Sequence, residues 1–316
     1  MNYAVSVDMG GIAVKIGLFT PEGVLLDKAE MPTNSRLGKD SVFDNIAASV
    51  RRLIRKNRIP LSECSFGLGF PAAVDRFGHI EAAVDLHLYD LYPADELSRR
   101  LDGMPVAVEN DANAAALGEM WQGGGKGYGS LILITLGTGI GGGIIIDKKI
   151  LRGVHGIAGE IGHIQVNPDE PERCNCGGKG CLDQIASATG IVRYARRFLE
   201  KDPGRSVLCG KDPLTAKDVV DAARNGDRIA LESLTYCMSF LGKMIADVSY
   251  VIDPELVIIG GGVSKAGDFL LDMIYDQYKC WPKLKNSLMQ FSLAKLSGEA
   301  GMYGSAYLAL ENAPKR

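Results

Sequence analysis

The sequence lacks a long uninterrupted run of apolar residues, and it lacks an excess of basic charge. No apolar run approaches the roughly eighteen residues of a transmembrane helix. The first residues, MNYAVSVDMGG, show neither the charged nor the apolar region of a signal peptide. The formal net charge of −3 argues against general binding of nucleic acid or anionic membranes. We therefore expect a cytoplasmic protein with no membrane or nucleic-acid partner.

The sequence also lacks an even number of cysteines. Seven cysteines cannot form a closed set of disulfides, and the cytoplasm keeps thiols reduced. Three of them, Cys174, Cys176 and Cys181, fall within the short stretch CNCGGKGC. The intervening glycines let the backbone fold tightly enough to aim three thiolates at one point. A zinc site needs a fourth ligand, for which His163 is the candidate; the alternative is a reduced, metal-free loop.

The chain is long enough for two domains, with 316 residues of which 46% are hydrophobic and 23% charged. Strands and helices alternate, and one pattern occurs twice. The strand 3–8 runs into Gly10-Gly11 and a second strand 13–19, and the strand 130–136 runs into GTGIGGG and a further strand. This repetition predicts two related half-folds.

Periodicity predicts the remaining elements. A helix over 40–57 carries an apolar face, made up of Val42, Ile46, Val50, Leu53 and Ile54. We expect further strands over 65–70, 106–109 and 255–260. We expect further helices over 94–101, 111–121, 184–200, 215–225, 227–250 and 301–312.

Three glycine turns follow strands, at Gly10-Gly11, at 137–143 and at 260–262. Consecutive glycines expose backbone N–H groups that can cradle phosphate, although a single such turn can equally be a tight hairpin. Three in one α/β chain, the first preceded by Asp8, favour a nucleotide. There is no P-loop pattern, and GTGIGG leads into a strand rather than a helix, so the dinucleotide-fold interpretation fails.

Six stretches of the sequence together resemble the ROK sugar kinases and repressors of the hexokinase/actin-like ATPase superfamily. They are DMGG, ENDANAAALGE, LGTGIGGGIIID, GIAGEIGH, CNCGGKGCLD and DPELVIIGGGV, and they cover almost the whole chain in order. The resemblance implies an α/β fold with two actin-like ATPase (ribonuclease H-like) domains, whose mixed sheets flank a central cleft. We expect a small domain over 1–112, completed by a C-terminal helix 301–316, and a large domain over 113–300 that carries the cysteine loop.

The resemblance implies an ATP-dependent hexose kinase that uses Mg²⁺ and a structural Zn²⁺ and forms a homodimer or homotetramer. Glucose, phosphorylated to glucose 6-phosphate, is the substrate it implies first. Allose, mannose and N-acetylmannosamine are alternatives, and a non-catalytic sugar-binding protein is another. Family repressors carry an N-terminal helix-turn-helix, and here the first strand begins at residue 3, so we do not expect a repressor.

The family's functional residues match positions of this chain. Asp111 matches the general base and Asn110 a sugar ligand, although Asp111 could instead be a helix N-cap. Glu160, His163 and Asp183 match further sugar ligands, with His163 shared between zinc and sugar. The positions that match the ATP and magnesium site are Asp8, Gly10, Gly11, Ile12, Lys15, Gly137, Thr138, Gly139, Gly261 and Gly262.

Four positions depart from the family pattern. Ile12 replaces a threonine whose hydroxyl can meet a phosphate, so turnover should be reduced. Ala72 replaces a glycine, the stretch 85–88 reads DLHL in place of Asn-Leu-Gly-Trp, and Asp183 replaces a glutamate. The last three changes fall where the resemblance puts the sugar ring, so they bear on which hexose is bound.

Overall fold

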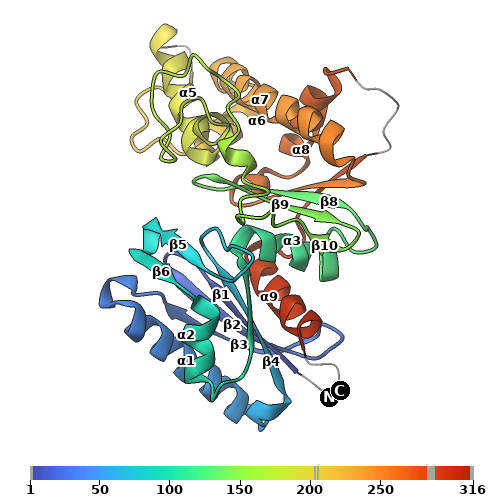
Figure 1. The fold of residues 1–316 in the computed structure, drawn as a ribbon. Coiled ribbons are helices and arrows are strands. Elements are labelled where there is room, and N and C mark those ends of the chain that lie inside the picture. Colours follow the sequence, from blue (N-terminus) through green and yellow to red (C-terminus); the bar gives the residue numbers. More distant parts are fainter. Residues whose placement is uncertain (1–2, 203, 205, 283–288, 314–316) are drawn as a thin grey trace. The chain divides into compact units, whose positions relative to one another are not determined.

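Figure 1 shows the fold in a computed structural model, which describes residues 3–202, 204, 206–282 and 289–313. The contacts divide the chain into two compact units. The first comprises Met1–Gly129, Gly143–Gly159 and Lys295–Arg316, and the second Ser130–Gly142 and Glu160–Ala294. The domain boundaries expected from the sequence stay a prediction, and residues 314–316 of the expected last helix lie outside the described residues.

The first unit is built on a five-stranded sheet with the order β3-β2-β1-β4-β7. β1 pairs antiparallel with β2 and parallel with β4, so the sheet is mixed. The strands are β1 (Tyr3–Met9), β2 (Ala13–Phe19), β3 (Leu25–Pro32), β4 (Cys64–Phe70) and β7 (Val106–Asn110). A separate hairpin, β5 (Ile80–Ala83) with β6 (Leu88–Leu91), was not predicted.

Successive residues of β1 point to opposite faces of this sheet. Val5 and Val7 belong to the core under α1 (Lys39–Lys56), while Ala4 packs with Met302 of α9 (Ala300–Glu311) on the other face. The five apolar residues predicted for one face of α1 are all buried, which confirms that helix. By the same alternation Asp8 falls on the α9 face.

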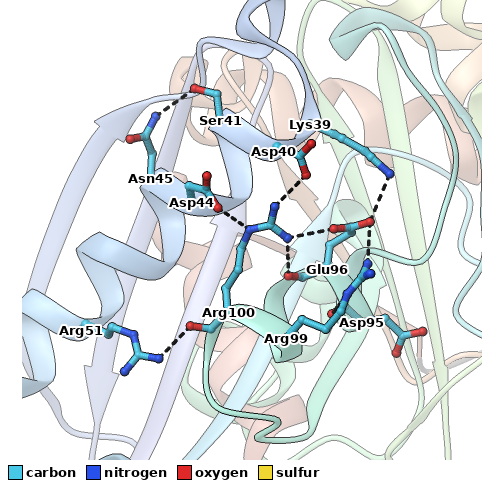
Figure 2. Close-up of polar contacts among 10 residues, drawn as sticks. All are labelled: Lys39, Asp40, Ser41, Asp44, Asn45, Arg51, Asp95, Glu96, Arg99 and Arg100. Carbon is cyan, nitrogen blue, oxygen red and sulfur yellow. Dashed lines mark hydrogen bonds and ion pairs between the residues drawn. The ribbon is translucent and has the colours of Figure 1, made fainter.

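An ion-pair cluster joins α1 to α2 (Pro93–Arg100) (Figure 2). The Arg100 guanidinium contacts Asp40 and Asp44 of α1 and Glu96 one turn earlier in α2. Lys39 and Arg99 also contact Glu96. The two helices are therefore held together by charge as well as by apolar packing.

Helices α3 (Asp111–Gln122) and α9 cross at very short range. A Cβ on Gly304 would stand 1.6 Å from the Ala114 carbonyl oxygen, and one on Gly118 would stand 2.1 Å from that of Ala300. Only glycine allows backbones to approach so closely. This crossing fixes the start of α3 relative to the sheet on which α9 packs.

The second sheet repeats the strand order of the first, as β10-β9-β8-β11-β12. Its strands are β8 (Leu131–Leu136), β9 (Ile140–Ile146), β10 (Lys149–Ile150), β11 (Leu256–Gly260) and β12 (Gln290–Leu293). β11 is parallel to β8 and β12, and β10 is antiparallel to β9. The shared order confirms the two related half-folds that the repeated glycine turns predict.

The helices that follow are α4 (Asp183–Ala186), α5 (Ala188–Lys201), α6 (Ala216–Arg224), α7 (Arg228–Ile252) and α8 (Asp268–Lys279). Short 3-10 helices are η1 (Ser35–Leu37), η2 (Leu61–Glu63), η3 (Val84–Leu86), η4 (Ile161–His163), η5 (Val263–Ala266) and η6 (Ser297–Glu299). α7 is long and apolar enough to cross a membrane by length and composition, but 61% of its most apolar window is buried within the protein. It packs against α5, α6 and α8, as the core helix of a helical layer does.

Candidate active site

The sequence-predicted site residues divide between the two units. The first unit contains Asp8, Gly10, Gly11, Ile12, Lys15, Asn110 and Asp111. The second contains Gly137, Thr138, Gly139, Glu160, His163, Cys174, Cys176, Cys181, Asp183, Gly261 and Gly262.

Two carboxylates lie near each other in the first unit. Asp8 is packed closely on α9, where a Cβ on Gly301 would stand 2.5 Å from its Oδ1. Burial raises the pKa of Asp8 to about 6, the negative charge of Asp111 adds to this rise, and the positive charge of Lys15 opposes it. Lys15 Nζ also donates to the Gly298 carbonyl. A divalent cation beside Asp8 would relieve the repulsion between the two carboxylates.

Two hydrogen bonds hold the first glycine turn in place, and both come from Thr33, a buried residue directly after β3. The Thr33 hydroxyl donates to the Gly10 carbonyl at 2.6 Å, and the Thr33 N–H donates to the Ile12 carbonyl at 2.9 Å. The Ile12 side chain itself is 89% exposed. Sequence reasoning missed Thr33 because a single threonine after a strand belongs to no motif.

Asn110, rather than Asp111, is the N-cap of α3. Asn110 Oδ1 accepts the N–H groups of Ala112 at 2.9 Å and Asn113 at 3.1 Å, and its Nδ2 donates to the Ala72 carbonyl at 3.2 Å. Asp111 is the first helical residue, and its Oδ1 accepts the Ala112 N–H at 2.8 Å. The alternative of Asp111 as the N-cap is therefore wrong. Its carboxylate lies at the helix end where the backbone dipoles stabilise negative charge.

Glu109 stabilises the junction between β7 and α3, and this role was not predicted. The side chain is 1% exposed. Its Oε1 accepts the Asn110 N–H and Asn113 Nδ2, both at 2.9 Å, and its Oε2 pairs with Arg152. The carboxylate thus links the end of β7, the first turn of α3 and the segment after β10. Its position at the end of a strand was the only signal in the sequence.

In the second unit, the glycine turn after β8 borders a cavity of about 310 Å³. The residues around this cavity are Gly137, Thr138, Ala188, Ala216, Lys217, Val220, Asp221, Arg224, Gly262, Val263, Lys265 and Ala266. Three of the predicted nucleotide residues, Gly137, Thr138 and Gly262, therefore meet at one cavity. Gly261 packs beside it with φ +84°, where a Cβ would stand 2.4 Å from the Leu136 carbonyl oxygen.

The cavity also has walls that the sequence did not reveal. The Arg224 guanidinium lies 5.4 Å from the centroid of the Phe269 ring and donates to the Ala266 carbonyl. Lys217 and Lys265 also line the cavity, and the lining Asp221 pairs with Lys217 at 2.5 Å and with Arg224 at 4.0 Å. An apolar slot with a basic rim suits an aromatic base attached to phosphates. Helical periodicity predicts α6 but does not say that one side of it lines a cavity.

Four potential metal ligands converge in the cysteine loop. The ligand atoms of His163, Cys174, Cys176 and Cys181 all lie within 4.8 Å of one another. Cys174 Sγ lies 3.7 Å from His163 Nδ1, and Cys176 Sγ lies 3.6 Å from Cys181 Sγ. Zinc–sulfur bonds of roughly 2.3 Å in a tetrahedron require ligand separations of this size. The donor set and its spacing therefore fit zinc.

Glycine and electrostatics both shape this loop. Gly180 has φ +70°, and a Cβ there would stand 1.7 Å from the Asn167 carbonyl oxygen, so the loop can close only with glycine at this position. A hydrogen bond from the Gly178 backbone lowers the pKa of Cys176, whereas burial raises the pKa of Cys181 to about 12. Metal binding would require Cys181 to lose its proton, so affinity should increase with pH.

Glu160 and Asp183, two residues matched to sugar ligands, lie in different segments of the second unit. Glu160 is half-buried, directly before η4, and its carbonyl accepts the His163 N–H at 3.1 Å. Asp183 opens α4, and its Oδ1 accepts the Ile140 N–H at 2.6 Å. The Asp183 carboxylate therefore contacts the glycine turn of its own unit.

The architecture and the glycine turns define the class of protein. Two mixed five-stranded sheets share one strand order, and in each a glycine turn joins the first two strands along the chain. This is the actin-like ATPase fold, as in the solved ROK glucokinase and hexokinase structures. The chain belongs to the ROK family, whose family model matches residues 4–312. The resemblance seen in the sequence is confirmed.

The relatives of the chain within this family include glucokinases of the same length. The glucokinase of Halalkalibacterium halodurans is 41% identical over 97% of this chain and 94% of its own. That of Streptomyces coelicolor is 37% identical over 99% of both chains. A ROK family glucokinase from Streptomyces griseus, solved in complex with glucose and AMPPNP, is 34% identical, with a TM-score of 0.80 over 98% of this chain and 100% of that one.

Proposed function

We propose that this chain is an ATP-dependent hexose kinase that transfers the γ-phosphoryl group of ATP to the 6-hydroxyl of glucose. The observation that carries the proposal is its similarity to glucokinases over essentially the whole length of both chains. In the structure, the Asp111 carboxylate at the start of α3 lies near Asp8 at the end of β1, and a nucleotide-sized cavity lies beside the second glycine turn. These features support the assignment of a base, a cation site and a nucleotide site.

We assign the role of general base to Asp111. A sugar hydroxyl is a poor nucleophile, and a carboxylate can accept its proton as the bond to phosphorus forms. The capping and bracing bonds made by Asn110 and Glu109 hold the first turn of α3, so the carboxylate is oriented before the substrate arrives. Cleavage of the γ-phosphoryl bond then leaves ADP and the sugar phosphate.

We assign Asn110, Glu160 and His163 to the sugar hydroxyls. His163 Nδ1 faces the thiol cluster, so Nε2 is the nitrogen that would contact a hydroxyl. Zinc held by His163 and the three cysteines would be structural, because four protein ligands close its coordination sphere. Its contribution would be to fix the imidazole ring.

We assign the glycine turns to the triphosphate and the cavity of the second unit to the adenosine. The turns comprise Gly10, Gly11 and Ile12 in the first unit and Gly137, Thr138 and Gly139 in the second, with Lys15 near Asp8. Gly261 and Gly262 would lie along the adenosine. Mg²⁺ bound near Asp8 would neutralise charge on the phosphates during transfer.

We further propose that the enzyme works in the cytoplasm as a homodimer or homotetramer. Reduced thiols are needed for the zinc ligands, and the cytoplasm maintains them. The α7 helix carries Tyr250 and Val251, which are 50% and 81% exposed. Such side chains suit an interface between copies.

The test is a panel of hexoses with Mg-ATP, scored by release of ADP. We expect glucose to give the highest kcat/KM, with mannose, allose and N-acetylmannosamine lower, and a dehydrogenase specific for glucose 6-phosphate to detect the product. Preference for another hexose would correct the substrate. Binding of a sugar without release of ADP for any hexose would make the chain a sugar-binding protein instead.

A further inference from the structure

We propose that Asp183 is a positioning residue for ATP, which holds the second glycine turn in shape for the triphosphate rather than binding the sugar. The proposal rests on the kinase function above. It changes the role that the family resemblance gives to this position, where the family has a glutamate and this chain an aspartate.

The Asp183 carboxylate is directed at the backbone of the turn. Its Oδ1 accepts the Ile140 N–H at 2.6 Å, a short bond to a charged acceptor. A Cβ on Gly139 would stand 2.7 Å from the same oxygen, so the contact requires both a glycine at 139 and a short acidic side chain at 183.

Two further bonds fasten the turn from the beginning of α5. The Ala188 N–H donates to the Gly137 carbonyl and the Thr189 hydroxyl to the Thr138 carbonyl, both at 2.8 Å. These bonds direct the two carbonyl oxygens toward α5. Carbonyl oxygens repel phosphate, whereas N–H groups attract it. Holding the carbonyls in place therefore determines which side of the turn can bind a phosphate.

The first unit fastens its glycine turn in a comparable way. There the hydroxyl of Thr33 donates to the Gly10 carbonyl, as that of Thr189 does to the Thr138 carbonyl. In the second unit a carboxylate is added, and it comes from the segment directly after Cys181. The Leu182 N–H donates to the Ile164 carbonyl, so the residue between Cys181 and Asp183 is bonded to the residue that follows His163.

The test separates nucleotide from sugar. Asp183→Ala should raise the KM for ATP by about tenfold or more, which is the scale of one hydrogen bond to a charged group, and should lower kcat. The dissociation constant for glucose, measured calorimetrically without nucleotide, should stay within about twofold. Asp183→Asn keeps an acceptor oxygen at the same distance, so it should restore most of the affinity for ATP.

Thr189→Val provides an independent variant, with Thr189→Ser as its matched control. Thr189→Val should raise the KM for ATP by a smaller factor than Asp183→Ala does, and Thr189→Ser should leave this KM unchanged. The affinity for glucose should be unchanged in both variants. Weaker glucose binding by Asp183→Ala at an unchanged KM for ATP would overturn the proposal and restore the role of sugar ligand.

The same variants remain informative if the kinase function is wrong. Calorimetric titration with AMPPNP measures nucleotide affinity without turnover. If the parent binds AMPPNP but phosphorylates no hexose, the kinase function fails, while weaker AMPPNP binding by Asp183→Ala still supports the positioning role. Unchanged AMPPNP binding by that variant, with its fold verified by circular dichroism, refutes it.

Discussion

The buried position of the Asp8 carboxylate lowers the free energy of unfolding of the metal-free protein. Its pKa is raised to about 6 from an ordinary 3.8 by burial and by Asp111. Between these values the folded protein binds more protons than the unfolded chain, so the free energy of unfolding falls as pH rises from about 4 to 6, and the cost is complete above pH 6. Such placement is typical of a group kept for binding a cation.

Asp8→Asn should therefore stabilise the metal-free protein while reducing its activity. At pH 7–8, and without Mg²⁺, the free energy of unfolding should rise by up to about 3 kcal/mol, because roughly two pKa units are removed. The gain should vanish near pH 4, and kcat should fall. Chemical denaturation at pH 4 and pH 7.5 measures the effect, with the exposed Glu81→Gln as control. A variant less stable than the parent at pH 7.5 would contradict this account.

Ile12 stands at a position where the family has threonine. Because the side chain is 89% exposed, its replacement should change the free energy of unfolding by less than about 0.5 kcal/mol. Ile12→Thr should lower the KM for ATP or raise kcat by up to about tenfold, since a hydroxyl can donate to a phosphate. Ile12→Val retains the shape without the hydroxyl and is the control. Equal values of kcat and of the KM for ATP in Ile12→Thr and Ile12→Val would mean that the side chain of residue 12 does not contact a phosphate.

At the scale of elements, the proposed zinc would hold the cysteine loop in its fold. We expect one zinc per chain by elemental analysis of protein purified without chelator. Cys176→Ala should lose the zinc, lower the Tm and weaken glucose binding, because His163 loses its fixed orientation. Cys280→Ala, an exposed cysteine outside the cluster, should retain the metal. Absence of zinc from the parent protein would refute the metal site.

The cluster in Figure 2 joins two helices through Arg100. Burial opposes ionisation of Glu96, but hydrogen bonds from Arg100 and Lys39 hold its pKa below the ordinary value. Arg100→Met should lower the free energy of unfolding by about 1–3 kcal/mol at pH 7, since three carboxylates lose a partner. A carboxylate whose pKa is lowered in the folded state stabilises the folded protein at pH values above its ordinary pKa of 4.5. The difference in the free energy of unfolding between Arg100→Met and the parent should therefore narrow as pH falls below about 4.

Urea denaturation at pH 7 and pH 3.5 measures this difference. Arg36→Met, an exposed arginine in η1, serves as control and should change little at either pH. A destabilisation by Arg100→Met that is equal at both pH values would indicate lost packing of the arginine side chain rather than lost charge.

Some elements were predictable and others were not. The apolar face of α1 and the strands that end in glycine turns follow from local periodicity, so the sequence predicts them. The hairpin of β5 and β6 was missed because each strand is only four residues long. Thr33 and Arg224 were missed because their roles depend on which elements pack around them. From the sequence Asp111 could be the N-cap or the base; the contacts of Asn110 exclude Asp111 as the N-cap, and its role as base stays a prediction.

At the scale of the whole molecule, two half-folds of one design carry different parts of the proposed chemistry. The first contains Asp111, the proposed base, and Asp8; the second contains the cavity assigned to adenosine and the thiol cluster. Each half has a glycine turn between its first two strands along the chain. The family and the fold follow from the whole length of the chain, whereas the resemblance makes the choice of hexose depend on a few positions such as Ala72 and the stretch 85–88.

The central claim is that Asp111 accepts the proton as glucose is phosphorylated. The most direct measurement compares the rate of glucose 6-phosphate formation by the parent and by Asp111→Asn at saturating Mg-ATP and glucose. The asparagine keeps the shape but cannot accept the proton, so the rate should fall by roughly 10²–10⁴ while the dissociation constant for glucose changes little. An asparagine variant that works at the parent rate would contradict the account.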